Sequence, residues 1–77
     1  MRATTQKKIE TIRNRIYGYH EMLSELSAEI EDQAAECADT ERGEARREAL
    51  EEEASTVSEL ADSLYDVVDE IDGQIGI

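Results

Sequence analysis

The chain has 77 residues, room for one domain at most, and contains no proline, phenylalanine or tryptophan. A proline-free sequence rich in alanine, glutamate, arginine and leucine is typical of long helices rather than of strands. The formal net charge is -12, but the apolar residues concentrate on one stripe, which argues against an intrinsically disordered chain. No segment approaches the roughly 18 consecutive apolar residues of a membrane span.

A first helix is predicted at about residues 5–37, with Thr4 or Thr5 capping its N-terminus. Its apolar residues recur at alternating spacings of three and four, the heptad pattern of a helix packed along another helix. The series comprises Ile9, Ile12, Ile16, Tyr19, Leu23, Leu26 and Ile30, and Gln33 and Cys37 continue it.

Further along the chain we expect a turn, a second helix and a short tail, at about residues 38–43, 44–72 and 73–77. Asp39 or Thr40 can cap the second helix. Gly43 could instead belong to the turn as the C-cap of the first helix, and Gly73 is expected to end the second. The heptad pattern of this helix consists of Leu50, Ala54, Val57, Ala61, Leu64, Val68, Ile71 and Ile75.

The two apolar series are symmetric about Thr40. Seven residues of the first series can each be paired with a residue of the second so that the two residue numbers sum to 80. The pairs are Ile9–Ile71, Ile12–Val68, Ile16–Leu64, Tyr19–Ala61, Leu23–Val57, Leu26–Ala54 and Ile30–Leu50. Chain reversal at Thr40 would stack them as successive core layers, with large Tyr19 against small Ala61. The sequence therefore predicts a single all-α domain, an antiparallel two-helix hairpin resembling a coiled coil.

A second apolar stripe, formed by Met22, Leu60 and Val67, flanks this seam. A two-helix hairpin cannot cover both the stripe and its seam, so we expect two copies to pair as a homodimeric four-helix bundle. A structural or assembly role for that bundle is the alternative to the inhibitory function considered below. Two alternatives stay open. Long side chains such as Arg15 could cover the stripe, or a different protein could bind it.

Signals for chemistry are weak. His20 is the single histidine, expected to lie near Tyr65 at the edge of the seam, and no serine lies in a recognisable nucleophile motif. The single cysteine, Cys37, has no partner for an internal disulfide and no Cys or His companions for a metal site. We expect a non-enzymatic protein without cofactor or metal. With no apolar secretory segment at the N-terminus, a cytoplasmic location is expected.

Acidity is the strongest functional signal, because residues 21–77 hold 19 acidic and 3 basic side chains. Such a rod could occupy a basic surface of a nucleic-acid-handling protein, gaining the electrostatic steering that DNA gains. The candidate contact residues are Glu31, Asp32, Glu36, Glu44, Glu48, Glu51 and Glu52. In size, charge and helicity the chain resembles DNA mimics and anti-CRISPR proteins of phages and mobile elements. That resemblance implies an inhibitor acting in the cytoplasm of a host cell.

RNA binding is a further alternative. The expected architecture is similar to that of the Rop family of small RNA-binding four-helix bundles, which implies recognition of RNA by basic side chains. The basic residues that could serve are Arg2, Lys7, Lys8, Arg13 and Arg15. Carboxylates near the end of the second helix, including Asp69 and Asp72, are expected to neutralise much of this cluster, and no stacking aromatics lie among these residues. Direct binding of nucleic acid is therefore the less favoured function.

Overall fold

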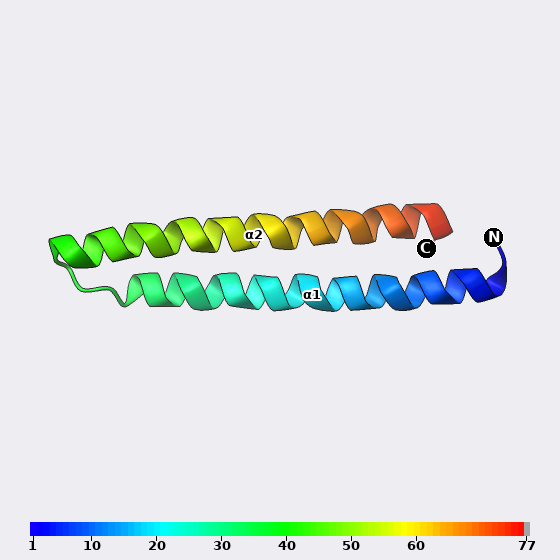
Figure 1. Cartoon of the computed structure of the whole chain (residues 1–77), viewed down its shortest axis with the longest axis horizontal. Helices are drawn as coiled ribbons and strands as arrows, with labels where there is room; N and C mark the ends of the chain where they lie inside the picture. The colour runs from blue at the N-terminus through cyan, green and yellow to red at the C-terminus, as the bar shows by residue number, and fades with distance from the viewer. Residues whose placement is uncertain (77) are drawn as a thin grey trace.

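Residues 1–76 form two long antiparallel helices in the computed structural model, α1 (Ala3–Ala35) and α2 (Glu41–Ile75), joined by a loop of residues 36–40. The two helices lie side by side over almost their whole length, so both termini lie at one end of the rod and the loop at the other (Figure 1). The rod measures 60 × 14 × 12 Å. The predicted all-α hairpin is therefore confirmed, and it is one layer of two helices.

The loop begins two residues and ends three residues earlier than predicted, because α1 ends at Ala35 and α2 begins at Glu41. Cys37 therefore lies in the loop rather than in α1, half-buried and with a free thiol. The Thr40 hydroxyl accepts a hydrogen bond from the Gly43 backbone N–H at 3.0 Å, which is the N-cap expected of this residue. Gly43 belongs to the first turn of α2, so its assignment to the turn was wrong.

The outer ends of the helices also differ from the prediction. Arg2 takes the N-cap position of α1 in extended conformation, and Thr4 and Thr5 lie inside the first turn instead of capping it. Gly73 is helical, and α2 continues to Ile75 because Gly76 supplies the stop. Gly76 has φ 79°, a left-handed conformation that glycine adopts without steric cost, and its N–H donates to the Asp72 carbonyl. Only the last residue of the predicted tail, residue 77, lies outside the described residues.

Side chains of α1 hydrogen-bond to backbone carbonyls of α2, and these bonds fix how the helices face each other. Ser27 Oγ donates to the Ala54 carbonyl at 3.0 Å, and His20 Nδ1 lies 2.7 Å from the Ala61 carbonyl. Both pairs of numbers sum to 81 rather than 80. Ala54 and Ala61 are only 2% exposed, and such small residues allow two helices to pack closely. One row of the interface is therefore made of small and polar residues spaced by seven.

Three of the seven predicted core pairs are consequently wrong: Ile12–Val68, Tyr19–Ala61 and Leu26–Ala54. Ile12, Tyr19 and Leu26 are 53%, 58% and 42% exposed. The residue that follows each of them faces α2 instead. Arg13 binds a carboxylate of α2, and His20 and Ser27 donate hydrogen bonds to backbone carbonyls of α2. The residues of the other four pairs, which involve Ile9, Ile16, Leu23 and Ile30, are all half-buried, as expected of a second row of the interface.

Arg47 closes the loop end of the hairpin. Its guanidinium donates to the carbonyls of Ala34 at 3.3 Å and Cys37 at 3.1 Å. The last turn of α1 contains no basic residue of its own, so α2 supplies the positive charge that the C-terminal end of a helix favours. Arg47 thereby adds a second donor to the Ala34 carbonyl, which also accepts from the Cys37 N–H, and ties the loop carbonyl of Cys37 to α2.

Candidate protein-binding surfaces

An exposed apolar face covers the middle of the rod. We define it by six side chains that are 40–61% exposed: Ile12, Tyr19, Met22, Leu26, Leu60 and Val67. Met22, Leu60 and Val67 flank the seam as the sequence predicted. The other three were assigned to the core and join this face because Arg13, His20 and Ser27, which follow them in α1, face α2 in their place.

Both helices contribute to the same apolar face. Leu26 and Ile30 of α1 line one shallow groove together with Ala49 and Val57 of α2. Leu60 follows Val57 by three residues and Val67 follows Leu60 by seven, so all three lie on one side of α2. Tyr19, Met22, Leu23 and Leu26 line a second groove next to the first. The apolar face is therefore continuous across the hairpin.

Negative charge is concentrated in the half of the rod next to the loop. Residues 21–60, which we call the acidic end, hold fourteen carboxylates and three arginines, a balance of -11. All fourteen carboxylates are exposed. The rest of the chain holds six carboxylates and five basic side chains, a balance of only -1. Because the chain reverses at the loop, the acidic segments of both helices lie at the same end, and the rod carries most of its negative charge there.

The structure brings some of the predicted acidic contact residues together and separates others. Glu31 of α1 and Glu51 of α2 line one groove over a floor that includes Ala34 and Ala54. Glu48, Glu51 and Glu52 line a neighbouring hollow along α2 with Ser55. Asp32, Glu36 and Glu44 are exposed but line neither groove. Asp32 is turned away from Glu31 around α1 and Glu36 lies in the loop, whereas Glu44 lies on the same side of α2 as Glu51, seven residues earlier. The carboxylates are therefore spread around the acidic end, and in the Glu31–Glu51 groove each helix contributes one.

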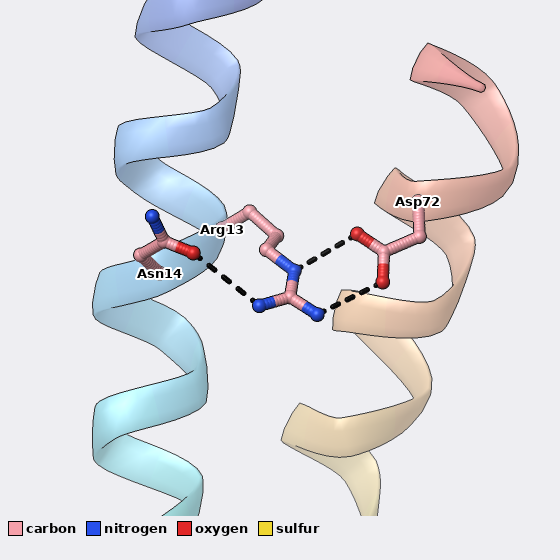
Figure 2. A network of polar contacts seen from close by, with 3 residues as sticks. All are labelled: Arg13, Asn14 and Asp72. Atoms are coloured by element: carbon pink, nitrogen blue, oxygen red, sulfur yellow. Dashed lines mark hydrogen bonds and ion pairs between the residues drawn. The ribbon is translucent and has the colours of Figure 1, made fainter. Parts of the chain in front are cut away.

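A polar cluster joins the helices at the terminal end of the rod. Arg13 makes two hydrogen bonds to Asp72, Nε to Oδ1 at 2.8 Å and Nη2 to Oδ2 at 3.0 Å, and a third to Asn14 at 3.3 Å (Figure 2). Its guanidinium also lies 5.3 Å from the centre of the Tyr17 ring. This is the single ion pair found in residues 1–76. To bind a phosphate, Arg13 would have to leave this carboxylate.

Because Arg13 hydrogen-bonds to its carboxylate, the pKa of Asp72 lies below its ordinary value. A carboxyl group whose pKa falls on folding stabilises the folded state above its unfolded pKa, about 3.9, and loses that contribution as the pH drops through the lowered value. Asp72→Asn is therefore expected to lower the thermal midpoint slightly at pH 7. The difference from wild type should shrink below about pH 4, as followed by circular dichroism. A difference that stays constant down to about pH 2 would contradict this assignment.

His20 serves the interface between the helices. A carbonyl oxygen can only accept, so the contact with Ala61 places a proton on Nδ1. The imidazole ring lies 5.7 Å from the ring of Tyr17 and 5.3 Å from that of Tyr65, measured between centroids. The expected proximity to Tyr65 is confirmed. His20 therefore has a packing role that accounts for its position.

Neither helix contains a stretch of residues 1–76 that is apolar and long enough to cross a bilayer. Within the same residues, no three His, Cys, Asp or Glu side chains lie so that they could share a metal ion. Searches with this chain find no matching family model, no matching curated protein and no matching solved structure. The function is therefore inferred from the exposed apolar face and the acidic end.

Proposed function

We propose that this protein is a non-enzymatic inhibitor or regulator whose acidic end binds a basic surface of another protein. The observation that carries the proposal is the balance of -11 confined to residues 21–60, with every carboxylate exposed. A basic surface built to bind nucleic-acid phosphates would recognise such a rod by the same charge complementarity. Proteins that handle nucleic acids are thus the partner class, as for the phage-encoded DNA mimics that the chain resembles.

The Glu31–Glu51 groove adds a chemical detail to this proposal. Its floor is small and apolar because Ala34 and Ala54 lie there, and each helix contributes one carboxylate beside it. Arg47 also lines the groove, but its guanidinium donates to the carbonyls of Ala34 and Cys37 at the loop end. The aliphatic part of a lysine or arginine side chain would fit such a groove, with its charge held between two carboxylates. We therefore place the centre of the contact at Glu31 and Glu51, with Glu48 and Glu52 beside it.

Reversing the charge of four groove residues tests the proposal. The variant Glu31→Lys, Glu48→Lys, Glu51→Lys, Glu52→Lys is expected to lose at least about 100-fold in affinity for a basic partner, since close charge pairs at interfaces contribute about 1.5 kcal/mol or more each. The measurement is quantitative mass spectrometry of proteins captured by the tagged chain from nuclease-treated lysate, at low and at high salt. Wild-type partners should be released by salt.

A matched control changes the charge by almost the same amount at the other end of the rod. Asp62, Asp66 and Asp69 are exposed residues of α2 outside the acidic end, and their replacement by lysine should leave capture of the partner nearly intact. Circular dichroism should show helical content close to wild type for both variants. If the two variants lose the partner equally, or if neither does, the acidic end is not the binding surface.

A structural or assembly function is the second candidate, and the exposed apolar face favours it. Here the protein would act as a homodimeric four-helix bundle whose contacts survive high salt, because apolar burial is not screened by ions. A partner retained at high salt but lost when Met22, Leu60 or Val67 is replaced by a charged residue would support this function over charge mimicry.

A further inference from the structure

We infer that the apolar face binds a second copy of this chain with the two loops at opposite ends, which gives a four-helix bundle with an acidic end at each extremity. The homodimer stands on the apolar face and on the charge distribution alone. Only its consequence, two binding ends on one rod, rests on the proposed function. Each step of the inference draws on a different observation.

The hairpin by itself has little core. Within residues 1–76 no large side chain is fully buried, and the most buried residues other than Val68 are small: Ser27, Ala34, Gly43, Ala54 and Ala61. A chain of this size with one layer of two helices gains little from apolar burial. Pairing two such layers through their apolar faces would supply the missing core, as four-helix bundles do.

The apolar face has the extent that a stable dimer needs. From Ile12 to Ile30, which lines a groove with Leu26, it runs about 27 Å along α1, and two packed helices are about 20 Å wide. The resulting projected area of about 540 Å² per copy is above the roughly 500 Å² per partner that a specific interface needs. A second copy offers a face of identical length and composition, so the two surfaces match by construction.

The apolar face is also centred on the rod. Its exposed residues in α1 run from Ile12 to Leu26, so their midpoint is residue 19, which is also the midpoint of α1 (Ala3–Ala35). A two-fold axis perpendicular to the rod near Tyr19 therefore superimposes the two faces over their full length. In that arrangement Ile12 packs against Leu26 of the second copy, and Tyr19 packs near its own equivalent.

Charge decides between the two ways of placing one rod on the other. With the loops at the same end, two acidic ends of -11 each would lie along each other. With the loops at opposite ends, each acidic end lies along a half whose balance is only -1. Helices about 10 Å apart are separated by little more than one Debye length at physiological salt, about 8 Å, so the repulsion between two acidic ends is only partly screened. The second arrangement also places Lys8 near Glu29 of the second copy, at the edge of the apolar face.

This dimer leaves the Glu31–Glu51 groove open. The groove lies over the row of small residues that includes Ala34 and Ala54, whereas the apolar face flanks the other row of the interface. Each dimer thus presents two equivalent grooves near its two ends. On the proposed function, one dimer could bind two basic surfaces at once, with the gain in avidity that linked sites give.

Oligomeric state and label distance test the inference with purified protein. Sedimentation equilibrium should show wild type as a dimer at micromolar concentration, and the variant Met22→Glu, Leu60→Glu as a monomer. The control Ala28→Glu, Ser55→Glu adds the same charge on exposed residues away from the apolar face, one on each helix, and should stay dimeric. Loss of helicity in the first variant alone also supports the inference, because Met22 and Leu60 are 61% and 52% exposed in the single hairpin.

The relative orientation of the two copies follows from the distance between their loops. Pulsed electron spin resonance measures this distance between nitroxide labels attached at Asp39→Cys, in a Cys37→Ser background. Loops at opposite ends predict a distance of roughly 50 Å between the labels, and loops at the same end predict less than about 25 Å. A monomeric wild type, a dimer that survives Met22→Glu, Leu60→Glu, or the short distance would overturn the inference. None of these readouts needs a partner protein, so failure of the proposed function would leave them unchanged.

Discussion

Replacing Ala61 by leucine is expected to lower the thermal midpoint of the hairpin by about 5–20 °C. Ala61 is 2% exposed, and its carbonyl accepts the hydrogen bond from His20. A leucine there has no free space and would force the two helices apart. Overpacking of this kind costs about 1–3 kcal/mol, and each kcal/mol shifts the midpoint by about 4–8 °C in a domain of this size. Circular dichroism melts at one fixed protein concentration measure the effect.

Ala45→Leu is the matched control, since Ala45 is an exposed residue of the same helix. Leucine and alanine have similar helix propensities, so this change should alter stability by no more than about 0.5 kcal/mol. If Ala61→Leu melts at the same temperature as Ala45→Leu, the helices are not held together by the row of small residues. The hydrogen bonds of Ser27 and His20 would then need another explanation.

The sequence contains enough information for the hairpin but led to the wrong rotation of α1. Heptad spacing in two segments and the mirror relation about Thr40 predict two antiparallel helices, which the structure confirms. The choice between Tyr19 and His20 as the residue facing Ala61 was made on hydrophobicity, and it failed. A polar side chain can face the partner helix when it donates to a backbone carbonyl there, as His20 and Ser27 do.

A signal for the correct rotation was present in the small residues. Ser27 and Ala34 are seven residues apart in α1, and Ala54 and Ala61 are seven apart in α2. Two such rows are where helices can approach most closely, and in the structure they face each other with Ser27 opposite Ala54 and His20, one heptad earlier, opposite Ala61. Hydrophobicity alone favours the neighbouring row because it counts apolar area and ignores how close the two backbones must come.

The candidate surfaces were predictable to different degrees. A count of charges was enough to place the acidic end next to the loop, because chain reversal near Thr40 brings both acidic segments together. Which carboxylates share a groove depends on the rotation of both helices, so the pairing of Glu31 with Glu51 could not be obtained from the count. The apolar face was predicted from Met22, Leu60 and Val67, but its full extent followed only once Tyr19 was found outside the core.

Replacing Gly43 by alanine should destabilise the hairpin, although alanine is the better helix former by about 1 kcal/mol. Gly43 is buried in the first turn of α2, and a Cβ atom there would overlap the carbonyl oxygen of Ala38 and lie 2.7 Å from its carbonyl carbon. The loop backbone would have to move, and with it the carbonyl of Cys37 that Arg47 binds. By analogy with overpacked cores, we expect a net cost of about 1–3 kcal/mol.

Gly18→Ala is expected to change the thermal midpoint in the opposite direction to Gly43→Ala. Gly18 lies inside α1, and among the described residues no atom lies within 4 Å of a Cβ atom added there. Alanine should therefore stabilise the chain by about 0.5–1 kcal/mol and raise the thermal midpoint by a few degrees. The same chemical change thus lowers the midpoint at one glycine and raises it at the other, because only Gly43 is in contact with the loop backbone. A rise at both positions would show that the loop does not cross the first turn of α2 at Ala38.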